Sequence, residues 1–119
     1  MTLNWSDFPD APASGTVLCP VDVLASDRVV SDMVNGFPYL GLLVDGMPRV
    51  YVNACPHQFL PLDHRSDALL SADGRHFLCT NHAAVFRVED GAGTGGEGIG
   101  CTLSAVPVTV RGDMVVVSG

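Results

Sequence analysis

The sequence predicts an all-β domain, an antiparallel barrel or sandwich, and three observations support this prediction. About seven short apolar segments alternate with turn signals, which is typical of antiparallel β folds. Gly (13) and Pro (8) are frequent among the 119 residues, so the chain turns often and a helical bundle is disfavoured. The length suits one compact domain, which we assign to residues 14–119, with residues 1–13 as an N-terminal arm.

The first expected strands are residues 16–18 and 21–24, two short apolar segments broken at Pro20. Residues 26–34 have an apolar spacing that fits either a short helix or a strand with irregular edges, and the sequence leaves both open. Residues 39–44 are an apolar run that predicts a further strand. The dipeptide Asp45-Gly46 then predicts a hairpin turn, because Gly tolerates the positive φ that a tight turn requires.

The next expected strand covers residues 49–53, where Val50 and Val52 alternate with their neighbours. Residues 76–78 and 85–88 are two further short strands, each next to an Asp-Gly turn signal. The chain is expected to close with strands at residues 105–110 and 114–117, joined across Gly112-Asp113.

The segment Gly91 to Gly96 spells G-x-G-x-x-G, a pattern also found in dinucleotide-binding sites. That role requires a strand before the motif and a helix after it, whereas further glycines and a strand-like segment follow here. The sequence therefore predicts a flexible loop over these residues.

The charge balance is acidic, with 13 Asp and Glu against six Arg and a net charge of −7. Nucleic acid is excluded as a partner, because a phosphate backbone requires a basic surface. An acidic surface favours encounter with a basic protein partner at low salt, although the same charge also simply keeps a protein in solution.

No stretch reaches the roughly 20 apolar residues of a membrane span, so no membrane association is expected. Residues 1–12 carry Asp7 and Asp10 and no basic segment, which does not resemble a secretory signal. These observations predict a cytoplasmic protein. Because the cytoplasm is reducing, the four cysteines are expected to have a use other than forming disulfides.

Two pairs of potential metal ligands each follow an expected strand. The first is Cys55-Pro56-His57 and the second is Cys79-Thr80-Asn81-His82. Thiolate and imidazole are the ligands that select zinc, copper or iron–sulfur clusters. One such pair alone would most simply be a buried thiol and an ordinary polar group, but two pairs in matched positions indicate a metal centre.

The sequence around these pairs resembles the Rieske iron–sulfur family, in its low-potential ferredoxin-like branch. Cys-x-His followed later by Cys-x-x-His is the family signature, and the flanking residues 53–63 and 77–86 are similar to its two cluster loops. The resemblance implies a Rieske-like β-sandwich or barrel with a small cluster-binding subdomain of two loops. It also implies one [2Fe-2S] cluster, with Cys55 and Cys79 on one iron and His57 and His82 on the other.

The resemblance also implies a low reduction potential. High-potential members carry an extra cysteine in each loop, and the matching positions here are Leu60 and Asn81. Those members place Ser and Tyr hydroxyls on the cluster sulfurs, where this chain has Ala84 and Phe86. Fewer hydrogen-bond donors stabilise the reduced state less, so we expect a potential near −150 mV, roughly the low end of the Rieske range. Ala83 stands where the family usually has Gly, which leaves the loop geometry open.

The function implied is that of a one-electron carrier, which takes electrons from a flavoprotein reductase and passes them to a terminal oxygenase or another redox acceptor. The chain is not expected to be an enzyme itself, since it lacks the catalytic domain of a terminal Rieske oxygenase. Two alternatives remain: a zinc-binding structural or interaction module with the same Cys₂His₂ set, and a small Rieske subunit of a larger oxidoreductase.

The remaining residues of interest have ordinary expected roles. Cys19 and Cys101 are expected to be structural thiols, and a bridge between them cannot be inferred from sequence. His64 and His76 are expected to be surface groups. The methionines Met33, Met47 and Met114 are expected to fill the core.

Overall fold

The computed structural model describes residues 5–8, 10–54, 70–72, 74–79, 84–95 and 102–118, with Cys79 described by its backbone alone. Within these residues there are ten strands and two short 3₁₀ turns, η1 (Trp5–Asp7) and η2 (Val21–Val23). None of the described helices is long enough or apolar enough to cross a membrane. All strand pairs are antiparallel, which confirms the predicted all-β class.

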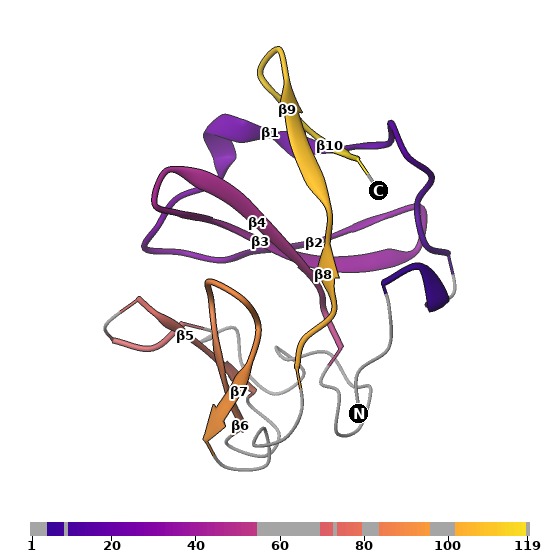
Figure 1. The fold of residues 1–119 in the computed structure, drawn as a ribbon. Helices are drawn as coiled ribbons and strands as arrows, with labels where there is room; N and C mark the ends of the chain where they lie inside the picture. The colour runs from indigo at the N-terminus through magenta and orange to yellow at the C-terminus, as the bar shows by residue number, and fades with distance from the viewer. Residues whose placement is uncertain are drawn as a thin grey trace.

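The strands form three sheets, which Figure 1 shows as three levels. The upper sheet has the order β1-β10-β9 and contains β1 (Val17–Pro20), β9 (Val108–Arg111) and β10 (Met114–Val117). The middle sheet, β2-β3-β4-β8, contains β2 (Val30–Val34), β3 (Phe37–Val44), β4 (Met47–Val52) and β8 (Ala105–Val106). The small sheet, β5-β6-β7, contains β5 (His76–Cys79), β6 (Ala84–Arg87) and β7 (Gly93–Gly95).

The middle sheet is buried on both faces, which explains its long apolar run. Successive side chains of a strand point to opposite faces of the sheet. On β3, Tyr39 faces the core shared with the upper sheet, whereas Leu40 and Leu42 face the core shared with the small sheet. A strand that is covered on both sides needs apolar residues at every position rather than at alternate ones.

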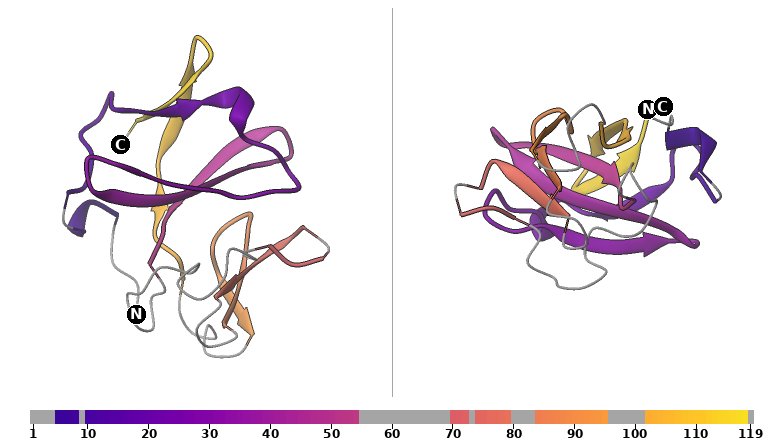
Figure 2. Two further views of the ribbon diagram at one scale, coloured as in Figure 1. Left: turned by 180° about the vertical axis from the view of Figure 1, so that it is seen from behind. Right: turned by 90° about the horizontal axis from the view of Figure 1, so that it is seen from below.

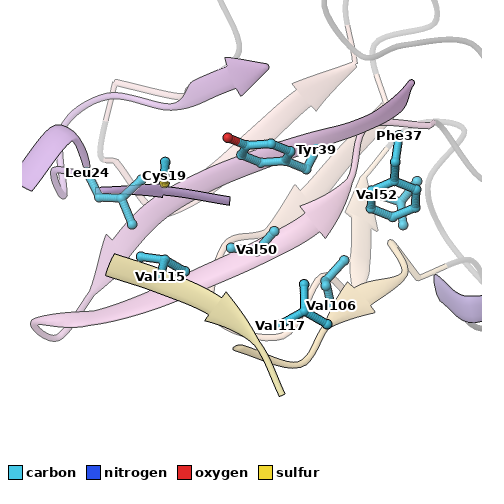
Figure 3. Packing of buried hydrophobic residues seen from close by; sticks show 9 residues of the cluster. All are labelled: Cys19, Leu24, Phe37, Tyr39, Val50, Val52, Val106, Val115 and Val117. Carbon is cyan, nitrogen blue, oxygen red and sulfur yellow. The ribbon is translucent and has the colours of Figure 1, made fainter. Parts of the chain in front are cut away.

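The upper core lies between the upper and middle sheets (Figure 3). Side chains from β1, β3, β4, β8 and β10 converge there, and Val115 and Phe37 are completely buried. Trp5, Phe8 and Ala11 of the N-terminal segment pack against the same cluster. This core supports the middle sheet from the side opposite the small sheet.

Two tight turns set the register of the middle sheet. Asp45 and Gly46 have φ values of 52° and 79°, so the predicted hairpin turn between β3 and β4 is confirmed. Asn35 and Gly36 have φ values of 50° and 87° and form the equivalent turn between β2 and β3. Asn-Gly is a strong signal for such turns, and it also settles residues 30–34 as a strand rather than a helix.

Several sequence-based expectations differ from the structure. Residues 21–23 form η2 instead of a strand, and the turn is closed by the Leu24 N–H, which donates to the Val21 carbonyl at 3.2 Å. The stretch 105–110 is divided at Pro107, because β8 pairs with β4 whereas β9 pairs with β10. Met33 and Met47 are 63% and 59% exposed and do not fill the core.

The glycine-rich segment was expected to be a flexible loop, but its residues 93–95 form β7, which pairs with β6. The backbone of glycine pairs like that of any other residue, and the absence of side chains only removes the pattern by which strands are predicted. A Cβ at Gly95 would lie 3.3 Å from Val85, so the close approach of the two strands favours glycine there.

Candidate metal centre

Three of the four predicted ligands, Cys55, His57 and His82, lie outside the described residues. Cys79 is the last residue of β5, and its side chain is also outside the described part. The four ligands therefore stay a prediction. What the structure does describe is the set of strands from which the two ligand pairs extend.

The segment that leads to the first pair is held firmly at the end of β4. Asn53 is 5% exposed, and its N–H donates to the Pro38 carbonyl at 3.1 Å. Its side-chain Nδ2 donates to the Ser31 hydroxyl at 3.3 Å. The Ala54 N–H donates to the Val52 carbonyl at 2.9 Å. The backbone is thus fixed up to the residue that precedes Cys55.

The second pair begins at Cys79, the last residue of β5. β5 and β6 pair antiparallel, and the pair Cys79↔Ala84 is the last one of this ladder. Thr80 to Ala83 therefore connect two strand ends that lie side by side. Ala84 and Phe86 are fully buried, so the hairpin is anchored in the core directly after the connection.

The elements that carry the two pairs pack against one another through the core between the middle and small sheets. The rings of Tyr51 on β4 and Phe77 on β5 meet edge to face, with centroids 5.5 Å apart and planes at 79°. Leu40, Leu42, Ala84, Phe86, Val88 and Leu103 complete this buried cluster. Figures 1 and 2 show the end of β4 and the small sheet on the same half of the molecule.

The charged groups of the small sheet that are described lie at its far end from Cys79. His76 opens β5, is half-buried and pairs with Arg87 across the hairpin. Arg87 contacts Asp90 and lies 3.7 Å from Glu89. The hydrogen bond from Arg87 holds the pKa of the Asp90 carboxyl below its usual value. This ion pair is exposed and joins the last residue of β6 to the turn that follows it.

Among the described residues, no three His, Cys, Asp or Glu side chains come together as a metal site. Cys19 is a free, buried thiol on β1, as expected for a structural cysteine. Burial raises the pKa of this thiol, so it stays protonated at neutral pH. Cys101 and His64 lie outside the described residues.

Comparison with known proteins identifies the family. Residues 14–108 match the family model of the Rieske [2Fe-2S] domain. This chain belongs to the Rieske [2Fe-2S] domain family. The predicted resemblance is thereby confirmed, and a Rieske domain carries a [2Fe-2S] cluster. No curated protein matches the sequence of this Rieske domain.

Solved structures support the fold of this Rieske domain. The ferredoxin of carbazole 1,9a-dioxygenase from Nocardioides aromaticivorans IC177 matches with a TM-score of 0.70 and 21% identity, over 89% of this chain and 98% of that chain. The terminal oxygenase of carbazole 1,9a-dioxygenase from the same organism matches with a TM-score of 0.72 and 19% identity, over 88% of this chain but 30% of the oxygenase. A chain from the complex of reduced oxygenase and oxidized ferredoxin in carbazole 1,9a-dioxygenase matches with a TM-score of 0.66 and 19% identity. This match covers 87% of this chain and 91% of that chain.

The residue types of the two predicted ligand pairs fit the group that the family implies. Thiolate and imidazole are the donors of a Rieske cluster, and the predicted ligands Cys55, His57, Cys79 and His82 would supply two of each. Both pairs extend from strand ends that belong to one packed core. Residues on a rigid strand end hold a ligand in place better than residues on a long loop.

Proposed function

We propose that this Rieske domain is a one-electron carrier, a Rieske-type ferredoxin that is not itself an enzyme. The observation that carries this proposal is the family match over residues 14–108. The match to a ferredoxin over 98% of that ferredoxin's length supports it. We assign residues 14–119 to the Rieske domain and residues 1–13 to an N-terminal arm.

We assign the cluster ligands to Cys55, His57, Cys79 and His82, holding a single cluster. When bound, this group supplies one-electron redox chemistry at a potential that its two imidazole ligands raise above that of an all-cysteine cluster. The chain's own contribution is to hold the ligands and to keep water from their core side. Phe77, Ala84 and Phe86 are each fully buried, so the two strands next to the second pair are packed into an apolar core.

The partners in this proposal are a flavoprotein reductase as donor and a terminal oxygenase or another redox acceptor. The named complex of an oxygenase with a ferredoxin supports this type of pairing. A net charge of −7 suits a basic docking surface on the partner, since opposite potentials accelerate encounter. The cytoplasm stays the predicted location.

The test is to reduce the purified protein anaerobically and record its electron paramagnetic resonance spectrum, with iron, sulfide and zinc assayed on the same sample. We expect a rhombic signal of low average g and about two irons and two sulfides per chain. Cys55→Ser and Cys79→Ser should abolish the signal. Cys19→Ala is the matched control and should keep it, because Cys19 is a free, buried thiol of the upper sheet. A colourless protein with about one zinc would instead establish a structural zinc module.

A further inference from the structure

One side chain joins the middle sheet to the small sheet. Tyr51 lies on β4, is 1% exposed, and its hydroxyl donates to the Val88 carbonyl at 2.7 Å. Val88 directly follows β6, and its own N–H donates to the Arg75 carbonyl at 2.9 Å, just before β5. The Tyr51 hydroxyl therefore binds Val88, the residue that links the end of β6 to the start of β5.

The ring of Tyr51 is also enclosed, by Phe77 and by Gly91. Its edge-to-face contact with Phe77 reaches β5. A Cβ at Gly91 would lie 3.0 Å from Tyr51 Cε1, so glycine is the residue that leaves room for the ring. The Gly91 carbonyl accepts a hydrogen bond from the Leu103 N–H at 2.9 Å. This bond holds Gly91 in place beside the Tyr51 ring, at the junction between the middle and small sheets. Tyr51 thus has a single position between the two sheets.

The contacts of Tyr51 lie on the strands that lead into both ligand pairs. Tyr51 itself is four residues before Cys55 on the same chain segment. Phe77 is two residues before Cys79, and Val88 is six residues after His82. Cys55 follows β4 of the middle sheet, whereas Cys79 ends β5 of the small sheet, so the two cysteines extend from different sheets. Tyr51 is the described side chain that contacts this junction by both its ring and its hydroxyl.

We propose that Tyr51 is a positioning residue for the cluster: it fixes the Cys55–His57 segment relative to the Cys79–His82 hairpin through its bond to Val88 and its ring contact with Phe77. This inference rests on the proposed function, because it assumes that these four residues hold the cluster. Tyr51 touches no ligand in the described structure and acts through the two strands. Its loss would loosen the ligand geometry and expose the cluster to water and oxidants.

Tyr39 provides a matched control within the same sheet. It lies on β3, is also 1% exposed, and its hydroxyl donates to the Leu18 carbonyl at 3.0 Å. That bond joins the middle sheet to β1 of the upper sheet, and neither strand leads into a ligand pair. Removing either hydroxyl takes the donor from a backbone carbonyl, which is part of a buried bond at Val88 and of a part-buried bond at Leu18, so both variants should lose stability of a similar order.

The experiment compares the holoproteins of Tyr51→Phe, Tyr39→Phe and wild type. The measurements are the melting temperature, the rate of cluster bleaching in air, the electron paramagnetic resonance spectrum of the reduced protein, and amide hydrogen exchange of β5 and β6. We expect similar melting temperatures in the two variants. Tyr51→Phe alone should bleach roughly five-fold faster or more, because only this variant weakens the contact between β4 and the small sheet. It alone should show altered g values and faster exchange at residues 84–87.

Equal bleaching rates and unchanged spectra in both variants would overturn the inference and leave Tyr51 a purely structural residue. This failure is distinct from failure of the proposed function, which would appear as a wild-type protein without iron and sulfide. The hydrogen-exchange measurement also separates them, since it reports on the junction whichever metal is bound. Unchanged exchange at β5 and β6 in Tyr51→Phe would by itself contradict the inference.

Discussion

The predicted low reduction potential depends on two residues of the small sheet. Ala84 and Phe86 are both fully buried and have no hydroxyl, whereas the high-potential members of the Rieske family place Ser and Tyr there. The apolar character of this wall is now a feature of the described structure. The low reduction potential inferred from it remains a prediction.

We expect Ala84→Ser to raise the midpoint potential, because a hydroxyl that reaches a cluster sulfur stabilises the more negative reduced state. Val85→Thr is the matched control, since it adds a hydroxyl to the neighbouring position on the opposite face of β6. A redox titration checks both. No shift with Ala84→Ser, or the same shift with Val85→Thr, would contradict the assignment of this face to the cluster.

Glycine is required at one turn of the small sheet for two reasons. Gly91 has a φ of 77°, and a Cβ there would meet Tyr51 at 3.0 Å and the Leu103 carbonyl at 3.1 Å. Gly112 at the tip of the β9–β10 hairpin has a φ of 59° but no neighbour within 4 Å. The first position combines backbone strain with a steric clash, whereas the second involves backbone strain alone.

Gly91→Ala should therefore lower the free energy of unfolding by about 2–4 kcal/mol, the sum of a strained backbone and an overpacked contact. Gly112→Ala should cost about 1–2 kcal/mol. Urea denaturation followed by circular dichroism measures both values. If the two variants were equally stable, Gly91 would not be the close contact at the sheet junction that the structure describes.

At the scale of elements, the sequence predicted the strands whose side chains follow a pattern. Residues 39–44, 76–78 and 114–117 were recognised because burial requires apolar residues there, and all three lie within strands. β7 was missed because glycines carry no such pattern, and the division at Pro107 was missed because both halves are apolar. Which sheet a strand joins is decided by tertiary packing. That packing involves residues far apart in the sequence, so the residues of the strand itself do not indicate it.

The candidate site was predictable from the sequence to a different extent. The ligand types and their spacing come from Cys55, His57, Cys79 and His82, and the family they indicated is confirmed. The contact between β4 and the small sheet was not predictable. Tyr51 is separated from Val88 by 37 residues, and nothing in the sequence near either residue signals their hydrogen bond.

The upper sheet offers a test of how its central strand is buried. Val115 on β10 is completely buried, and its cross-strand partner Val110 on β9 is 42% exposed. Val115→Ala should lower the free energy of unfolding by about 2–3 kcal/mol, since it removes two methyl groups and leaves a cavity. Val110→Ala should change it by less than about 0.5 kcal/mol. A urea titration that gave equal losses would contradict the assignment of Val115 to the upper core.

At the scale of the whole molecule, the three levels make the middle sheet the common support of both cores. The upper core carries no predicted ligand, whereas the core below the middle sheet joins both ligand-bearing segments. Each core contains one fully enclosed tyrosine whose hydroxyl crosses to the next sheet. The stability of the layered fold therefore depends on these two hydroxyls staying protonated.

Alkaline pH should destabilise the protein through these groups. Burial raises the pKa values of Tyr39 and Tyr51 well above the usual value, because a phenolate in either core would lose its hydration. Above roughly pH 10 the unfolded tyrosines release protons that the folded ones retain, so the folded state binds more protons and stability falls as pH rises. Burial of Cys19 acts with the same sign from a lower pH, near the ordinary thiol pKa.

We expect the free energy of unfolding to decrease by about 1.4 kcal/mol per pH unit for each tyrosine above roughly pH 10. Urea midpoints measured from neutral to alkaline pH give this slope. Tyr39→Phe should remove the share of this slope that belongs to Tyr39, and Tyr51→Phe should remove an equal share, because in each variant one titrating tyrosine is absent. A stability that stayed constant through the ordinary tyrosine pKa would mean that water already reaches these hydroxyls, and that the sheets are less tightly joined than the structure indicates.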